Sequence, residues 1–254
     1  LLVSTTNLPL SDNAKQAIAI QAIPVGLVER RDLVHAQLNW PENPNPPFDR
    51  VQKTEVYTPR PHQSSAIQDV LSGFQTQSRG QLIMACGTGK TLTALWVCEQ
   101  GNYSRTLVLL PSLSLLKQTL NEWTANDTRG FKFLPVCSDD TVLGDDEAMG
   151  LASELGFPVT VNPEEIAAFL GEEGPLIVFS TYHSSPRIAE ALKASNLDGF
   201  DLIINDEAHR CTGRSESYYA TALRDELIPS HRRLFMTATP RTFSGHYKAQ
   251  SKSD

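Results

Sequence analysis

The feature that most constrains this chain is a glycine-rich loop between an apolar run and a helix candidate. The run is 81–84, the loop continues to Thr91, and the helix candidate spans 92–100. Glycines let backbone N–H groups turn toward phosphate oxygens, and the positive end of the following helix attracts the same anion. This order of strand, loop and helix predicts a binding site for a nucleoside triphosphate.

The residues of this loop have separate expected roles. We expect Lys90 to reach the β- and γ-phosphates and the Thr91 hydroxyl to ligate Mg²⁺. The backbone of Gly87, Thr88 and Gly89 is expected to surround the phosphates. The strict pattern begins with Gly, whereas this chain has Met at position 84. Taken alone, the loop could also be an ordinary glycine-rich turn.

The rest of the chain predicts an α/β fold class. Apolar runs lie at 81–84, 106–110, 133–136, 176–179, 202–204 and 234–236. Runs without polar alternation are typical of a parallel sheet that is covered on both faces. Between them, Leu113, Leu116, Leu120 and Trp123 share one helical face, and Asn162 precedes a proline at a helix start. We therefore expect a doubly wound, mostly parallel sheet.

Residues 1–57 are expected to form a partly helical extension and a linker. A weak apolar stripe within 11–40 is interrupted by Pro24, and 40–47 are dense in proline, which is typical of linkers. Residues 58–242 then form the main domain, and 243–254 read as a polar linker. The chain starts with Leu1 and shows no secretion pattern, so we expect it to be part of a longer protein.

Composition limits the possible settings and partners. The net charge of −7 argues at first against nucleic acid, but 138–173 hold ten acids and no Lys or Arg. Without that stretch the chain carries 19 acids and 22 bases, so a local basic groove remains possible. Four cysteines lack zinc-site spacing and favour a reducing, cytoplasmic setting. No apolar run reaches membrane-spanning length.

A pair of carboxylates follows the apolar run at 202–204. Neighbouring strands of a parallel sheet end at one edge, so Asp206 and Glu207 can face the phosphate loop. We expect Asp206 to hold Mg²⁺ and Glu207 to orient and deprotonate an attacking water. Two acids at the start of a loop are common, and the prediction depends on their combination with the loop at 84–91.

Together these segments resemble the superfamily 2 helicases and translocases. Residues 206–209 read Asp-Glu-Ala-His, a DEAH box, and Met84 to Thr91 is similar to motif I of that superfamily. The resemblance covers about 58–242. It implies the first RecA-like domain of a nucleic-acid motor driven by ATP and Mg²⁺, with His209 taking part in coupling the ATP site to the nucleic acid.

The segment from Arg60 to Gln63 resembles the adenine-sensing segment of the same superfamily. The resemblance implies that both residues bind the nucleotide and that Gln63 reads the base. The same segment also reads as the entry to a helix, because the residues that follow form an apolar helical face (Ala66, Ile67, Val70, Leu71, Phe74). Both interpretations can hold.

Three more segments fit the resemblance. Pro111 and Ser112 resemble motif Ia, and Thr181 lies in a segment similar to the next backbone-contacting loop, which implies contacts with nucleic acid. A plain strand-to-helix turn is the alternative for Pro111 and Ser112. Thr237 and Thr239 resemble motif III, whose hydroxyls are implied to couple the DEAH box to the nucleic-acid site.

Residues 79–91, 162–165 and 180–185 look most like the motors of bacterial type ISP and type I restriction enzymes. This implies double-stranded DNA as the track, a second RecA-like domain, and nuclease or methyltransferase modules in the same chain or complex. Because the second domain supplies arginines to the ATP site, the isolated chain is expected to be a weak or inactive ATPase. A repair or remodelling helicase and a nucleotide-gated binding module remain alternatives. A P-loop kinase or GTPase is disfavoured, since DEAH and Thr-Ala-Thr-Pro have no role there.

Overall fold

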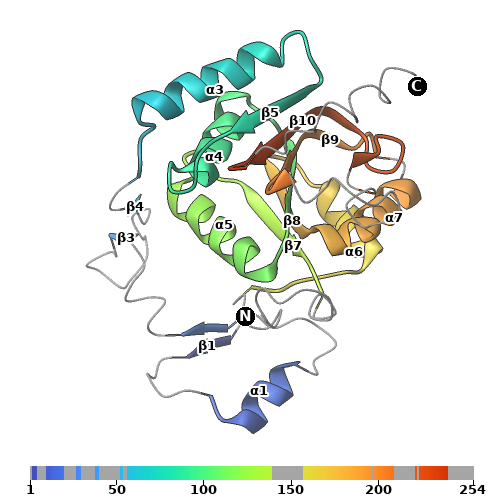
Figure 1. Ribbon diagram of the computed structural model, residues 1–254. Coiled ribbons are helices and arrows are strands. Elements are labelled where there is room, and N and C mark those ends of the chain that lie inside the picture. Colours follow the sequence, from blue (N-terminus) through green and yellow to red (C-terminus); the bar gives the residue numbers. More distant parts are fainter. Residues whose placement is uncertain are drawn as a thin grey trace.

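In the computed structural model, one sheet separates two layers of helices (Figure 1). The structure describes residues 2–4, 10–19, 27–29, 38–39, 52–53, 56–138, 157–195, 197–208, 221 and 223–239. The strands of the sheet are β5 (Arg79–Ile83), β6 (Arg105–Leu110), β7 (Lys132–Val136), β8 (Leu176–Thr181), β9 (Phe200–Asn205) and β10 (Ser230–Thr237). Their order is β5-β10-β9-β6-β8-β7 and every pairing is parallel. The predicted α/β class is confirmed, and each of the six apolar runs forms a strand.

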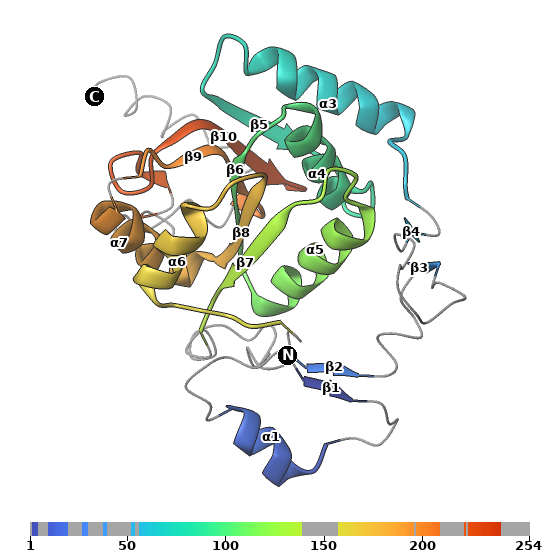
Figure 2. The same cartoon turned by 180° about the vertical axis from the view of Figure 1, so that it is seen from behind.

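The two helical layers cover opposite faces of the sheet (Figures 1 and 2). One layer contains α3 (Pro61–Gly73), α4 (Lys90–Gln100) and α5 (Leu113–Asn126), and the other contains α6 (Pro163–Leu170) and α7 (Ser185–Ser195). A short 3-10 turn, η3 (Tyr182–Ser184), joins β8 to α7. Each layer encloses its own apolar core. All six residues of β8 are buried, as expected for a strand covered on both faces.

Two helices form for the reasons that the sequence indicates. The predicted apolar face of α5 is buried, with Leu116, Leu120 and Trp123 each 0% exposed. Helix α6 starts after Asn162, whose side-chain Oδ1 accepts a hydrogen bond from the backbone N–H of Glu164 at 2.9 Å. This cap satisfies one of the free N–H groups of the first turn.

In the described residues of the N-terminal part there are one helix and two small strand pairs. Helix α1 (Asp12–Ala19) agrees with the predicted helical character. β1 (Leu2–Ser4) pairs in parallel with β2 (Leu27–Glu29), and β3 (Leu38–Asn39) pairs antiparallel with β4 (Gln52–Lys53). The proline-rich segment 40–47 and the tail 243–254 lie outside the described residues, so the domain boundaries stay predictions. None of the described helices combines the length and apolarity needed to span a membrane.

A buried arginine ties β10 to the loop that precedes it. Arg233 is 1% exposed, and its Nη2 donates to Asp225 Oδ1 at 2.8 Å and to the carbonyl oxygen of Ile228 at 2.9 Å. Arg79 of β5 donates to the other carboxylate oxygen of Asp225 at 2.7 Å. Partial burial opposes the charge of Asp225, but the hydrogen bonds from Arg79 and Arg233 outweigh it and lower the pKa of Asp225.

This lowered pKa predicts a pH-dependent contribution to stability. A carboxyl whose pKa is lower in the folded state stabilises the fold above its unfolded value, about 3.9, and loses that contribution as the pH falls through the folded value. Asp225→Asn removes the contribution. We expect the difference in free energy of unfolding between wild type and Asp225→Asn to be constant from pH 5 to 7 and to narrow below about pH 4. Urea unfolding at each pH measures it.

Asp69→Asn is the matched control, because Asp69 is exposed on α3. The free energy of unfolding of Asp69→Asn should stay close to that of wild type at every pH. A difference for Asp225→Asn that does not change between pH 3 and 7 would contradict the assigned role.

Candidate nucleotide-binding site

The glycine-rich loop has the backbone that phosphate binding requires. It leaves β5 at Met84 and enters α4 at Lys90. Gly87 and Gly89 have φ of +76° and +83°, which is the left-handed region that side chains rarely adopt. A Cβ at Gly89 would also collide with the side-chain amide of Gln63. Glycine at position 89 is therefore required by both the backbone angle and the close approach of Gln63.

Gln63 connects α3 to this loop. It is 4% exposed, and its Nε2 donates to the carbonyl oxygens of Thr88 at 3.1 Å and Gly89 at 3.3 Å. Its Oε1 accepts from the backbone N–H of Arg60 at 2.8 Å. The predicted helix entry is confirmed by α3, which begins at residue 61. The predicted base-reading role of Gln63 remains a prediction, because its amide here holds the loop.

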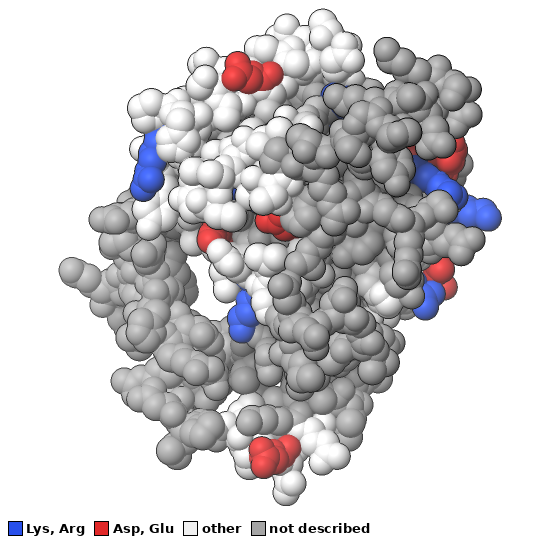
Figure 3. Space-filling model, in the orientation of Figure 1, with Lys and Arg blue, Asp and Glu red and all other residues white. Residues whose placement is uncertain are grey.

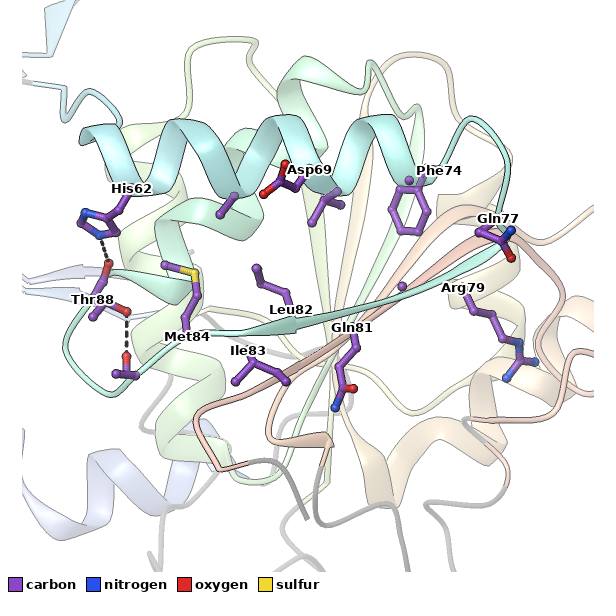
Figure 4. A pocket seen from close by; sticks show the side chains of 15 residues that line it. His62, Asp69, Phe74, Gln77, Arg79, Gln81, Leu82, Ile83, Met84 and Thr88 are labelled. Atoms are coloured by element: carbon purple, nitrogen blue, oxygen red, sulfur yellow. Dashed lines mark hydrogen bonds between the residues drawn. The ribbon is translucent and has the colours of Figure 1, made fainter. Parts of the chain in front are cut away.

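A groove of about 540 Å³ runs between α3 and β5 and ends at the loop (Figure 4). At that end His62 Nε2 lies 3.2 Å from the carbonyl oxygen of Thr88. Lys90, Asp206 and Glu207 are not among the residues that line the groove. The groove therefore lies beside the phosphate loop and does not contain the charged centre of the site.

The charged centre is formed by one lysine and two carboxylates. Lys90 Nζ lies 2.9 Å from Glu207 Oε1 and 3.3 Å from Asp206 Oδ1. The lysine lies more than 100 positions from the two carboxylates, which are adjacent in the sequence. The structure thus brings together the three residues predicted to be catalytic.

The strands that carry these residues are not neighbours, which corrects an expectation. We expected the strand before Asp206 to lie next to the strand before the phosphate loop. Instead β10 lies between β5 and β9. The long Lys90 side chain, at the first position of α4, spans the resulting gap.

Burial and charge act in opposite directions on these groups. Burial alone would lower the pKa of Lys90, but the hydrogen bond to Glu207 and the charges of Asp206 and Glu207 outweigh it, so the pKa of Lys90 is raised. Burial raises the pKa of the Asp206 carboxyl despite the nearby lysine. The site thus favours the charged form of Lys90, whereas burial disfavours the charged form of Asp206.

The backbone of Asp206 is fixed from two sides. Its N–H donates to the carbonyl oxygen of Leu109 at 2.9 Å, and its own carbonyl oxygen accepts from the Tyr182 hydroxyl at 2.8 Å. Glu207 has a φ of +49°, and its N–H donates to Asp206 Oδ1 at 2.9 Å. Tyr182 had no predicted role of its own, because nothing in the sequence places its hydroxyl near the carboxylates.

Trp123 is a second residue whose contribution the sequence does not reveal. The periodicity predicts only that it faces the core. In the structure its Nε1 donates to the carbonyl oxygen of Thr91 at 2.9 Å, so the core of the α3, α4 and α5 layer supports the first turn of α4 directly. The predicted Mg²⁺ ligand Thr91 is half-buried there.

The residues predicted to contact nucleic acid lie at strand ends on the same edge. Ser112 caps α5, with its Oγ accepting from the N–H of Leu115 at 3.3 Å, and it follows Pro111 at the end of β6. Thr181 is 0% exposed, and its hydroxyl donates to Ser184 Oγ at 3.2 Å. Direct contact between Thr181 and a phosphate would require this turn to open.

The two threonines of the predicted coupling segment lie beside the phosphate loop. The carbonyl oxygen of Thr237 accepts from the N–H of Met84 at 3.1 Å. The N–H of Thr239 donates to Thr237 Oγ1 at 3.2 Å. His209 lies outside the described residues. The proposed coupling roles of all three remain predictions.

The described charges on one face of the molecule can be followed in Figure 3. On this face the coloured Lys and Arg side chains lie at several separate places, and some lie beside Asp or Glu. Among the described cysteines, Cys98 and Cys137 are buried, as expected for incidental thiols, whereas Cys86 is exposed in the phosphate loop. Burial raises the pKa of Cys98 to about 11.

Residues 56–242 match the family ResIII, described as "Type III restriction enzyme, res subunit". The chain belongs to this family. The chain is also similar to the type ISP restriction–modification enzyme LlaBIII bound to DNA, with 31% identity and a TM-score of 0.76. The similarity covers 94% of this chain and 16% of the LlaBIII chain. A nuclease-deletion mutant of the type ISP enzyme LlaGI, in complex with a DNA substrate mimic, is 34% identical with a TM-score of 0.60 over 74% of this chain and 18% of that one.

A viral protein gives a further comparison. The probable helicase of African swine fever virus (isolate Tick/Malawi/Lil 20-1/1983) is 35% identical over 168 residues, which are 66% of this chain. This chain spans 18% of the length of that relative. The predicted resemblance to the helicase family and to type ISP enzymes is confirmed: the chain is a ResIII helicase-family domain.

Proposed function

We propose that this ResIII domain forms one wall of an ATP·Mg²⁺ site in a DNA translocase of a restriction–modification enzyme. The observation that carries the proposal is the convergence of Lys90, Asp206 and Glu207 at the end of the sheet. The similarity to two type ISP enzymes, both solved with DNA or a DNA mimic, supports DNA as the partner. A nuclease or methyltransferase module and a second RecA-like domain are further partners in this proposal.

The residues at the sheet edge fit ATP and Mg²⁺. Mg²⁺ prefers oxygen ligands and is usually held by one or two protein groups together with phosphate oxygens. Asp206 and the Thr91 hydroxyl offer such oxygens, and Lys90 already places a cation beside the Asp206 carboxylate. In the proposed complex, phosphate oxygens and water would complete the coordination.

Each residue has one role in the proposed reaction. When bound, ATP·Mg²⁺ would supply the γ-phosphate: water would form a bond to the γ-phosphorus while the bond to the β–γ bridging oxygen breaks and ADP leaves. Lys90 turns toward the β- and γ-phosphates and neutralises charge there. Glu207, released from Lys90, orients the water and takes its proton at a carboxylate oxygen. The backbone of Gly87, Thr88 and Gly89 holds the phosphates at the N-terminus of α4.

Removing the Lys90 ammonium should abolish nucleotide binding. Lys90→Ala deletes charge-assisted hydrogen bonds to phosphate, each worth about 1.5–3 kcal/mol. We therefore expect the affinity for ATP·Mg²⁺ to fall at least about 100-fold and the DNA-stimulated ATPase of the intact protein to disappear. Titration with a fluorescent ATP analogue and a steady-state ATPase assay measure the two effects.

Lys193→Ala is the matched control, because Lys193 is an exposed lysine of α7 on the far side of the sheet. It should leave both quantities unchanged. Nucleotide binding by Lys90→Ala within about threefold of wild type would contradict the phosphate role.

The viral relative supports one second candidate, a helicase that separates strands. Two assays on the intact protein distinguish the candidates. A translocase displaces a triplex-forming strand from duplex DNA without opening the duplex, whereas a helicase releases one strand of the duplex. ATP hydrolysis that neither double-stranded nor single-stranded DNA stimulates would overturn both candidates and favour a nucleotide-gated binding module.

A further inference from the structure

Asn205, the last residue of β9, carries a buried amide that satisfies none of its hydrogen-bonding capacity. It is 0% exposed, and among the residues that the structure describes neither its Nδ2 nor its Oδ1 has a hydrogen-bond partner. Buried polar groups are nearly always paired, because leaving one unpaired sacrifices its bonds to water without replacement. An apolar residue would make the fold more stable at this position, so the stability of the fold does not explain why the residue is an asparagine.

The position of Asn205 connects it with the ATP site. It immediately precedes Asp206, and its Cα partners are Leu109 of β6 and Phe235 of β10. Strand alternation places its side chain on the same face as Ile203, which belongs to the core beneath α6 and α7. Asn205 is therefore the last residue anchored in the sheet before the turn that carries both carboxylates.

That turn is the part of the site that has to rearrange. Glu207 adopts a left-handed backbone conformation, which is uncommon for a residue with a side chain, and its carboxylate is engaged by Lys90. In the proposed function, phosphates that bind Lys90 would replace this ion pair, and the turn would then be free to move. A buried amide with a free donor and a free acceptor, next to the turn, can pair with backbone groups of the turn once it has moved.

We propose that Asn205 is a positioning residue for Asp206 and Glu207, and that its amide hydrogen bonds form only when the carboxylate turn engages ATP·Mg²⁺. This inference rests on the proposed function. Interactions that are stronger in the reacting complex than in the resting protein raise kcat. The Asn205 amide, unpaired in the resting protein, would thus raise kcat by forming its hydrogen bonds at the catalytic step.

Two isosteric substitutions separate hydrogen bonding from packing. Asn205→Val and Asn205→Thr have the same shape, but only threonine can donate and accept a hydrogen bond. In the intact protein with saturating DNA, we expect Asn205→Val to lower kcat at least about tenfold with KM for ATP within about twofold of wild type. We expect Asn205→Thr to retain kcat within about threefold of wild type.

The thermal stability of the chain supplies the second measurement. Asn205→Val should have a Tm equal to or a few degrees above that of wild type, because it removes an unpaired polar group. Thr106→Val, a buried hydroxyl of β6 that contacts Cys98 Sγ at 3.2 Å, is the control. It should lower the Tm and leave kcat unchanged.

The outcomes distinguish this inference from the proposed function. A wild-type protein without DNA-stimulated ATPase would overturn the proposed function itself. An active wild type whose kcat is matched by Asn205→Val would overturn only the role of Asn205, as would equal losses in the Val and Thr variants. If the Val variant does not fold, Asn205→Ala and Asn205→Ser form a second matched pair and are judged by the same comparison.

Discussion

Glu207→Gln is expected to lower the kcat for ATP hydrolysis by about 10²–10⁴ while leaving nucleotide binding intact, because an amide cannot take a proton from water. The substitution keeps the size of the side chain and an oxygen that can still accept from Lys90, now 2.9 Å from Oε1. The phosphate loop and its lysine are unchanged, so ATP affinity should stay within about threefold of wild type. The effect is therefore confined to the chemical step.

The measurement is a steady-state ATPase assay on the intact protein with saturating DNA, together with a binding titration. Glu190→Gln is the matched control, because Glu190 is an exposed carboxylate of α7 that pairs with the neighbouring Arg187 at 3.0 Å. The control should retain wild-type kcat. Hydrolysis by Glu207→Gln at the wild-type rate would show that another group acts as the general base.

Trp123→Ala is expected to have the largest effect on stability, because the side chain is 0% exposed in the core between the sheet and α5. Its ring packs edge-on against Phe179 with centroids 5.5 Å apart and against Phe131 at 6.5 Å. Replacing a buried aromatic ring by a methyl group costs about 3–5 kcal/mol in the free energy of unfolding. The hydrogen bond from Nε1 to Thr91 contributes about 0.5–1.5 kcal/mol of the total.

Urea unfolding of the chain measures the loss, and Trp123→Phe separates its parts. Phenylalanine keeps most of the ring but cannot donate to the carbonyl oxygen of Thr91. The Phe variant should therefore lose less stability than the Ala variant, yet bind ATP·Mg²⁺ more weakly than wild type, since the first turn of α4 loses a fixed contact. Gln118→Ala, on the exposed face of α5, is the control and should change stability by under about 0.5 kcal/mol. A loss below about 1 kcal/mol for Trp123→Ala would contradict the packing argument.

Much of the fold follows from local patterns in the sequence. The apolar runs predict all six strands, because a strand buried on both faces needs apolar residues at nearly every position. The face of α5 and the Asn162 cap are likewise read from residues a few positions apart. The phosphate loop is predictable for the same reason, since its glycines and its lysine act within one short segment of backbone.

Contacts between distant segments could not be predicted in this way. The position of β10 between β5 and β9 depends on how the whole sheet assembles, and the expectation that β5 and β9 are neighbours was wrong. The hydroxyl of Tyr182 on the carbonyl oxygen of Asp206 and the indole of Trp123 on Thr91 join residues more than 20 positions apart. No periodicity or motif specifies such pairs.

The sequence by itself determined which groups make up the candidate site: a glycine-rich loop, a lysine and a pair of carboxylates, for which we propose phosphate, metal and water as partners. These properties belong to side chains and to local backbone, and they survive any arrangement that brings the segments to one edge of a sheet. Only the tertiary structure decided how the groups meet, with the Lys90 ammonium between Asp206 and Glu207. It also decided that Asn205 would be buried beside them without a partner, because burial depends on packing from both faces of the sheet and not on the residue itself.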